Sequence, residues 1–364
     1  LFIIFIQGCD FVNNDKSYHR EQNLRNVKRL RNLLKDLPEF CSEYFRGIEH
    51  TTSILTRINY AYDLRIFFNF LTKEIGEFIR LSPRQLSLEH LNKLKAVHIE
   101  KFLEYLTYYH NPSNPQQERE NNQTGKARKL AAVRSLLSYF FKKEKIDRNV
   151  ADLIDSPKIN EKPIVRLDVD EVAKLLDTVE TGQTLTKTQK RYHQYTRSRD
   201  LAILTLMLGT GIRISECIGL NVSDFNFETN GFKVTRKGGD QEILYFGDEV
   251  REAILQYLED RKNIQALKGH EDAMFLSIQR RRISHRALQN LVKKYAALVT
   301  PLKRITPHKL RSTYGTTLYQ ETGDIYLVAD VLGHKDVNTT RKHYAAISDD
   351  KRRMAARVIK LRED

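Results

Sequence analysis

The pattern of apolar and polar positions predicts a mostly helical first half of the chain. Over about 41–145, apolar residues recur every three or four positions, as in "RINYAYDLRIFFNFLTKEI" (57–75). This spacing is typical of amphipathic helices. Another helix is expected at 96–109, and a further one opens at Thr124. Between these two helices, the polar segment 111–123 contains prolines and predicts a loop.

The pattern changes after residues 155–167, which contain two prolines, have no helical period and form the best candidate for a linker. Beyond it we expect a polar, basic loop at 181–199 and then a buried helix that ends at Gly211. The segments "FNFE", "FKVTR" and "EILYF" alternate with a period of two and predict short strands, the first pair joined at the tight turn 230–231. After Val250 the pattern is helical almost to the end.

The expected fold class is therefore mainly α with a small antiparallel β-sheet, divided into two domains. A length of 364 residues is sufficient for two domains of ordinary size. The predicted parts are an N-terminal extension (1–36, with a basic helix at 16–36), a helical first domain (37–154), a linker (155–167), a second domain (168–350) and a C-terminal tail (351–364).

The charge of the chain points to a polyanionic partner. Lys and Arg number 61 against 46 Asp and Glu, which gives a net charge of +15 and a pI near 9.5. Nucleic acid is the commonest such partner, with an acidic membrane surface as the rival. No apolar stretch is long enough to span a bilayer, and no lipid-facing amphipathic helix stands out. Three widely spaced cysteines match neither a disulfide framework nor a zinc site and favour a reducing, cytoplasmic setting.

Basic residues crowd one end of the helix that opens at Thr124, and a further arginine lies within 57–75. They are expected to fall largely on the surface of their helices, where they could bind DNA phosphates. The alternative is an ordinary solvated helix face. The candidate DNA-binding residues are Arg65, Lys126, Arg128, Lys129 and Arg134.

In the second domain, chemically useful side chains lie at helix starts and turns. Arg213 follows a glycine turn at the start of a helix, where an anion is favoured, and Glu216 lies three residues further on. Lys237 occupies a hairpin tip next to glycines. Taken alone, each also fits a common surface feature, such as a weak Arg–Glu pair or a solvated turn lysine.

More such residues gather near the C-terminus. A threonine–proline pair opens the helix that carries His308 and Arg311, which are three apart and hence on one face. An H-x-x-R pair alone is common by chance. His334 directly follows Gly333, a predicted helix cap, and Tyr344 lies on a further short helix.

Together these residues could transfer a phosphoryl group from DNA to a tyrosine without a metal. Two guanidinium groups match two non-bridging phosphate oxygens, and histidines exchange protons near neutral pH. A lysine can protonate a departing alkoxide, and a tyrosine can act as a covalent nucleophile. No carboxylate cluster suggests a metal site, so we expect neither a metal nor another cofactor. The arginines would then stabilise the developing charge.

In their order and neighbourhoods, these residues resemble the tyrosine site-specific recombinases of the phage integrase family, Xer-like members in particular. The strongest pieces are "GTGIRISE", "HKLRSTYGTTL", "LGHKDVNTT" and the hairpin "TRKGGDQEILYF". The resemblance covers about 40–350. It implies a C-shaped clamp around double-stranded DNA, made of a core-binding domain at 37–154 and a catalytic domain at 168–350.

The resemblance also implies a role for each candidate residue. Tyr344 would be the nucleophile, and Arg213 and Arg311 would hold the phosphate. Lys237 would protonate the 5′ leaving oxygen, and His308 would share the tyrosine proton. His334 would add a hydrogen bond, and Glu216 would support these residues. In Xer-type members the nucleophile follows the glycine–histidine pair by one residue fewer, which lands on His343. We choose Tyr344 because it is the only tyrosine after His334. Tyr319 and Tyr326 have apolar neighbours and are expected to be packing residues.

Family members often dock a C-terminal tail on the neighbouring protomer of a homo-tetramer. Residues 351–364 combine basic and apolar positions and could do the same, or could fold back on their own domain. Two rivals to a recombinase remain open: a type IB topoisomerase with the same chemistry, and a catalytically inactive DNA-binding accessory protein. These residues fit an enzyme encoded by a bacterium, a phage or another mobile element. They fit integration or excision of a mobile element as well as Xer-type resolution of chromosome dimers.

Overall fold

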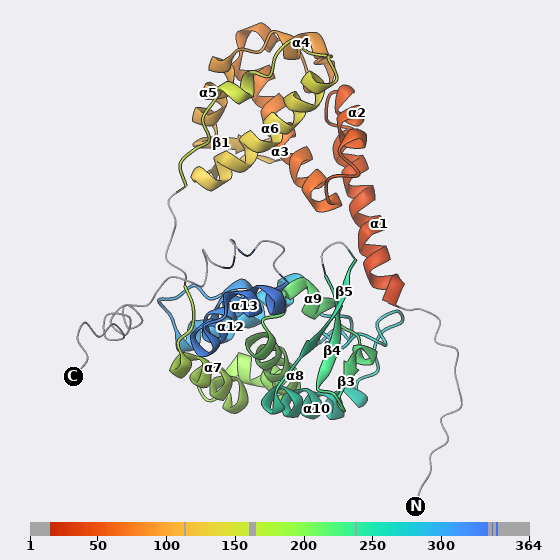
Figure 1. The fold of residues 1–364 in the computed structure, drawn as a ribbon, viewed down its shortest axis with the longest axis vertical. Helices are drawn as coiled ribbons and strands as arrows, with labels where there is room; N and C mark the ends of the chain where they lie inside the picture. Colours follow the sequence, from red (N-terminus) through yellow and green to blue (C-terminus); the bar gives the residue numbers. More distant parts are fainter. Residues whose placement is uncertain are drawn as a thin grey trace, which may run out of the picture. The chain divides into compact units, whose positions relative to one another are not determined.

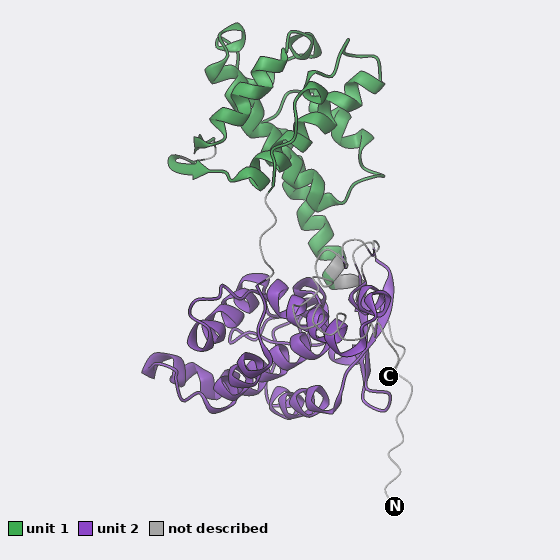
Figure 2. Ribbon diagram, turned by 60° about the vertical axis from the view of Figure 1, so that its left-hand side comes forward, with its two compact units in different colours: residues 1–161 green, residues 162–364 purple. Residues whose placement is uncertain are grey.

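The structure is a computed structural model in which the chain divides into two compact units, residues 1–161 (unit 1) and residues 162–364 (unit 2) (Figure 2). Helices dominate both units, and the strands form two small antiparallel sheets (Figure 1). This confirms the predicted fold class. The finer domain boundaries stay a prediction. The residues described are 15–112, 114–159, 165–236, 239–333, 337 and 340.

Unit 1 is a helical assembly with one β-hairpin. Its helices are α1 (Asp15–Leu34), α2 (Phe40–Gly47), α3 (Ile54–Glu74), α4 (Leu88–Asn92), α5 (Ala96–Tyr105) and α6 (Gln123–Lys142). Its strands are β1 (Tyr108–Asn111) and β2 (Asn114–Glu120), and single 3-10 turns span Gly76–Phe78, Pro83–Gln85 and Val150–Leu153.

The core of unit 1 forms around α3 and α6, which pack against each other. Local signals define where the two helices start. The side chain of Ser53 accepts a hydrogen bond from the Thr56 amide at 3.2 Å, and that of Asn122 accepts one from the Gly125 amide at 2.9 Å. Aromatic side chains from several helices then meet edge to face in the interior, as Phe67 of α3 does with Phe102 of α5 at 5.0 Å between ring centroids.

The predicted loop at 111–123 is wrong, because most of it forms strand β2. Tyr109 pairs with Arg119 and His110 with Glu118 across the hairpin. Tyr109 is buried, and its ring lies 5.5 Å from that of Tyr105 at the end of α5. Strand β2 has the sequence NPQQERE, which consists of polar residues and one proline, so it lacks the apolar alternation by which a strand is recognised in a sequence.

Unit 2 combines helices with a three-stranded sheet. Its helices are α7 (Val169–Thr181), α8 (Lys187–Thr210), α9 (Ile214–Gly219), α10 (Asp248–Lys262), α11 (His285–Val299), α12 (Pro307–Thr322) and α13 (Ile325–Leu332). Its strands are β3 (Phe225–Asn226), β4 (Gly231–Thr235) and β5 (Gln241–Tyr245), with a 3-10 turn at Val222–Asp224. Helix α8 packs against α7, α10 and α12.

The predicted loop at 181–199 is also wrong, since α8 begins at Lys187. A capping box starts the helix: the Thr186 amide donates to Gln189 Oε1 at 3.0 Å, and the Gln189 amide donates to Thr186 Oγ1 at 3.3 Å. The apolar second half of α8 is buried in unit 2 and was predicted correctly. Adding residues to an existing helix costs little free energy compared with starting a new one, so the polar half of α8 extends the buried half towards the N-terminus.

The strands lie where the period-two pattern predicted them, in the order β3–β4–β5. Phe232 and Val234 of β4 face the interior, and Phe232 stacks on Phe225 at 5.2 Å. The prediction of continuous helix after Val250 is only partly correct, because residues 263–284 form turns and isolated bridges. Among the residues that the structure describes, no helix is both long and apolar enough to cross a membrane.

Candidate active site

A glycine turn between α8 and α9 places Arg213. Gly211 ends α8 with a φ of +61°, and a Cβ there would lie 2.4 Å from Tyr314 Cδ1, so only glycine fits. Arg213 then occupies the N-cap of α9. Its amide donates to Glu216 Oε2 at 3.0 Å and its Nη1 donates to Glu216 Oε1 at 2.8 Å. With a side chain 32% exposed, Arg213 is held in place yet accessible to a ligand.

Helix α12 carries the second arginine. Thr306 and Pro307 start this helix as the sequence predicted. Arg311 lies one turn into it and is buried, with Nη1 donating to the carbonyl of Gly211 at 2.6 Å and Nη2 to that of Leu332. His308 lies one turn before Arg311 and is exposed. The pair therefore shares one helical face, as its spacing predicted.

The C-terminal end of α13 joins the two arginines. Arg213 Nη2 donates to the carbonyl of Gly333 at 2.9 Å, next to the Leu332 carbonyl that binds Arg311. Gly333 ends α13 in the left-handed conformation, as predicted, and Asp324 caps its start. The structure thus brings Arg213, Glu216 and Arg311 together at the turn that precedes His334 in the sequence.

Three predicted catalytic residues lie outside the described residues: Lys237, His334 and Tyr344. For two of them the structure describes the preceding residue, Arg236 and Gly333. The prediction that Tyr326 packs in the interior is wrong, because its side chain is 70% exposed. Helix α13 buries Val328 and Leu332 instead, on the face away from Tyr326, whereas Tyr319 of α12 packs beside this cluster as expected.

Sequence reasoning missed Arg236, which lies at the end of β4. Its guanidinium group bonds to Glu216, Glu242 and two carbonyls of α13. The alternation of β4 was an available signal: Phe232 and Val234 face inwards, so residue 236 does too. An inward-facing arginine requires acidic partners, and these come from distant segments that no local pattern identifies.

The candidate DNA-binding residues of unit 1 make contacts within their own unit. Lys126 Nζ donates to Thr107 Oγ1 at 2.7 Å, and Lys129 Nζ donates to Asn121 Oδ1 at 2.8 Å. Lys129 is buried, so its predicted place on the surface is wrong, and this burial lowers the pKa of its ammonium group. DNA contact by this set stays a prediction.

The arginines of the set bind acidic groups and backbone. Arg128 pairs with the buried Asp63, Arg134 donates to the carbonyl of Ala151 at 3.0 Å and also to that of Ile154, and Arg65 lies 3.5 Å from Asp36 and 5.1 Å from the Tyr62 ring centroid. Burial raises the pKa of Asp63 to about 6, against the lowering effect of Arg128 and Lys129.

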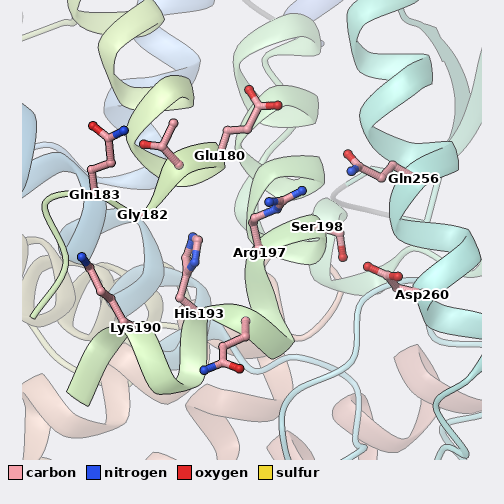
Figure 3. A pocket seen from close by; sticks show the side chains of 11 residues that line it. Glu180, Gly182, Gln183, Lys190, His193, Arg197, Ser198, Gln256 and Asp260 are labelled. Atoms are coloured by element: carbon pink, nitrogen blue, oxygen red, sulfur yellow. The ribbon is translucent and has the colours of Figure 1, made fainter. Parts of the chain in front are cut away.

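A polar cleft of about 570 Å³ lies in unit 2 at the end of α7 and along α8 and α10 (Figure 3). Side chains of both charges line it, among them Lys190, Arg197, Glu180 and Asp260. Of the predicted catalytic residues that the structure describes, Arg213, His308 and Arg311, none lines this cleft. Among the described residues, no group of three or more His, Cys, Asp or Glu side chains could hold a metal ion.

Comparison with known proteins identifies the class. The phage integrase family matches residues 165–351. The tyrosine recombinase XerC of Caldanaerobacter subterraneus subsp. tengcongensis is 31% identical over 84% of this chain and 81% of its own length. The tyrosine recombinase XerS of Lactococcus lactis subsp. cremoris is 27% identical over 92% of this chain and 98% of its own length. The chain belongs to the phage integrase family of tyrosine recombinases.

The chain is accordingly an enzyme that cuts and rejoins DNA, and its Xer-like character is confirmed. Solved structures share the fold. The XerH site-specific recombinase in its post-cleavage complex with a palindromic difH substrate has a TM-score of 0.62 and 19% identity, over 84% of this chain and 79% of that one. The Tn1549 transposon integrase with circular intermediate DNA has a TM-score of 0.60 and 19% identity, over 89% and 100%.

Proposed function

We propose that Tyr344 of this recombinase attacks a DNA phosphodiester that Arg213 and Arg311 hold. The observation that supports this most is the meeting of both guanidinium groups at the last turn of α13, on the carbonyls of Gly333 and Leu332. Two positive groups that the fold brings together from different helices form a site for the two non-bridging oxygens of one phosphate.

The strand transfer is a single displacement at phosphorus. The Tyr344 oxygen forms a bond to phosphorus while the bond from phosphorus to the 5′ oxygen breaks. His308 takes the tyrosine proton, and Lys237 gives a proton to the departing 5′ oxygen. The products are a 3′-phosphotyrosine and a free 5′-hydroxyl. Because the phosphotyrosine retains the energy of the phosphodiester, the 5′-hydroxyl of a partner strand can reverse the step without ATP.

The arginines stabilise this reaction through charge. Negative charge on the phosphate oxygens grows as the tyrosine oxygen approaches, and donors that are already oriented stabilise it without reorganising. Glu216 orients Arg213 through two hydrogen bonds, of 2.8 and 3.0 Å. His334, which follows the same turn, adds a further hydrogen bond in the transition state.

The proposed assembly is a homo-tetramer on two paired DNA sites, with residues 351–364 docking on the neighbouring protomer. Each protomer clamps double-stranded DNA between a core-binding domain at 37–154 and a catalytic domain at 168–350. The enzyme would act in the cytoplasm of a bacterium. Integration or excision of a mobile element and resolution of chromosome dimers both fit this chemistry.

The test compares Tyr344→Phe with Tyr326→Phe on a nicked suicide substrate carrying the recognition site. The cleaved fragment diffuses away from such a substrate, so a covalent adduct accumulates. Tyr344→Phe should bind the DNA and form no adduct, since phenylalanine has no nucleophilic oxygen. Tyr326 is an exposed tyrosine on α13, and its substitution should leave adduct formation unchanged. An adduct with Tyr344→Phe, or its loss with Tyr326→Phe, would contradict the assignment.

A second assay separates recombination from relaxation. The recombinase should join only substrates that carry its recognition site. Relaxation of any supercoiled plasmid, irrespective of sequence, would instead favour a type IB topoisomerase activity.

A further inference from the structure

Arg236 occupies an unusual position at the end of β4. Its side chain is only 8% exposed, although it is fully charged. Nε donates to Glu242 Oε2 of β5 at 2.6 Å, and Nη1 lies 3.3 Å from Glu216 Oε2. Nη2 donates to the carbonyl of Val331 at 3.1 Å, and Nη1 reaches that of Leu332 at 3.5 Å. One planar group thus links a strand pair, the start of α9 and the end of α13.

The end of α13 therefore receives three guanidinium groups. Arg236 bonds to the carbonyl of Val331, Arg311 to that of Leu332 and Arg213 to that of Gly333. The last carbonyls of a helix have no partner within the helix and form the negative end of its dipole. Cationic donors satisfy them, so these arginines together fix the turn that leads to His334.

Glu216 connects Arg236 to Arg213. Its buried carboxylate accepts hydrogen bonds from the side chains of both arginines. A buried carboxylate is stable as an anion only when opposite charges surround it. If Arg236 were lost, Arg213 would be the one cation left on Glu216 among the described residues, and both side chains would have more freedom to move.

Gly333 shows how closely Arg236 approaches α13. A Cβ on Gly333 would lie 2.8 Å from Arg236 Cζ, and the residue has a φ of +59°. Two independent features thus favour glycine here: the left-handed conformation and the guanidinium group beside it, which a Cβ would displace.

We propose that Arg236 is a positioning residue for DNA cleavage: through Glu216 and the end of α13 it holds Arg213 in the orientation that grips the scissile phosphate. This inference rests on the proposed function, in which Arg213 contacts that phosphate. We assign Arg236 no catalytic role, because Nε, Nη1 and Nη2 all bond to protein groups and the side chain is only 8% exposed, whereas that of Arg213 is 32% exposed. Its loss should therefore lower the rate of the chemical step more than the affinity for DNA.

The experiment measures the rate of covalent adduct formation on the nicked suicide substrate at saturating DNA, together with the DNA dissociation constant. Arg236→Met should slow adduct formation about 100-fold, which is the effect expected when Arg213 no longer holds the phosphate in the reactive position. The affinity for DNA should change less than about threefold. Arg236→Lys keeps the charge, but a single ammonium group cannot replace a planar fork, so it should remain well below the parent rate.

Arg261→Met is the matched control. Arg261 of α10 also donates to backbone carbonyls, those of Glu271 and Ala273, away from the α13 turn. Its substitution should lower the melting temperature without slowing adduct formation. An equal slowing in Arg261→Met, or the parent rate in Arg236→Met, would overturn the inference.

Two further comparisons separate positioning from general stability. Arg236→Met and Glu216→Gln should each slow cleavage, and the double variant should be little slower than either, because both act through Arg213. Additive effects on the rate would contradict the inference that Arg236 and Glu216 both act through Arg213. Gly333→Ala should slow adduct formation more than Gly323→Ala, since Gly323 also has a left-handed φ, +67°, but its Cβ position has no atom of the described residues within 4 Å apart from its chain neighbours. Equal rates for the two alanine variants would show that contact with Arg236 is irrelevant.

The outcomes also separate this inference from the proposed function. If the parent chain forms no adduct that depends on Tyr344, the proposed function fails. If the parent forms such an adduct and folded Arg236→Met and Arg236→Lys form it equally fast, only the role of Arg236 fails.

Discussion

Arginines and lysines are used differently in the two units. In unit 1, Arg128 and Arg134 bind separate structural groups, a buried carboxylate and the carbonyls that follow α6. In unit 2, Arg213 and Arg311 also bind protein groups, but they share one helix end. A basic residue near a helix start is thus weak support for DNA contact. Convergence of several guanidinium groups on one turn is stronger, because it concentrates positive charge where a phosphate can approach.

The same difference distinguishes arginines that only stabilise the fold from arginines that also position groups for DNA cleavage. A guanidinium group that binds carbonyls stabilises the fold wherever it lies. Within the part of the chain that the structure describes, the α13 turn is where that bonding also orients groups next to predicted catalytic residues. Substituting an arginine that binds carbonyls in either unit should therefore lower stability, whereas only substitution of the arginines at the α13 turn should reduce the rate of cleavage per bound complex.

The largest expected effect comes from Arg311→Lys compared with Arg134→Lys. Lysine retains the charge, but one ammonium nitrogen replaces the two separate nitrogens that bond to Gly211 and Leu332, and it presents no planar fork to a phosphate. Cleavage at saturating DNA should fall by about 100-fold or more for Arg311→Lys, the usual loss on removing an oriented donor. Quench-flow or gel assays of adduct formation measure this rate.

Arg134→Lys makes the same chemical change at carbonyls of unit 1. It should leave the single-turnover cleavage rate within about twofold of the parent, with some loss of stability. If the two variants slow cleavage equally, the distinction between the units is incorrect.

Features that depend on neighbouring residues could be predicted from the sequence. The threonine and proline that open α12, the glycine that ends α13 and the shared face of His308 and Arg311 are all local signals, and the structure confirms them. The period-two pattern likewise located β4 and β5.

Two kinds of feature were not revealed by the sequence. The polar half of α8 and strand β2 read as loops because neither has the apolar periodicity of its element. Arg236 was missed because its partners Glu216 and Val331 lie in segments that are distant along the chain. Lys129 was expected on the surface, yet it lies buried beside Asn121.

An effect on stability, not on the rate of cleavage, is expected in the pH dependence of unfolding. Burial raises the pKa of Asp63 in the folded chain to about 6, from an ordinary 3.8. Its Oδ1 is buried, with no hydrogen-bond partner among the described residues. Between about pH 4 and pH 6 the folded state thus binds a proton that the unfolded state releases, and the free energy of unfolding should fall as pH rises.

At about 1.4 kcal/mol per pKa unit, this decrease should reach about 3 kcal/mol across the window. Asp63→Asn should remove it, because asparagine does not titrate. Urea unfolding followed by circular dichroism at pH 4 and pH 6.5 measures the difference. An identical pH dependence in parent and variant would show that Arg128 and Lys129 compensate fully for the burial of Asp63.

The smallest effect is expected on DNA affinity, and it tests whether any basic residue at the start of α6 reaches DNA. Lys126 is partly exposed and bonds only to a threonine hydroxyl among the groups described, whereas Lys129 is buried. If Lys126 binds a phosphate, Lys126→Ala should reduce the slope of log affinity against log salt by about 0.9, the value for one phosphate contact. Lys129→Met should lower stability and leave this slope unchanged, because a buried ammonium group releases no counterion. A slope that changes with Lys129 and not with Lys126 would mean that unit 1 contacts DNA in a conformation different from the one described, with Lys129 exposed.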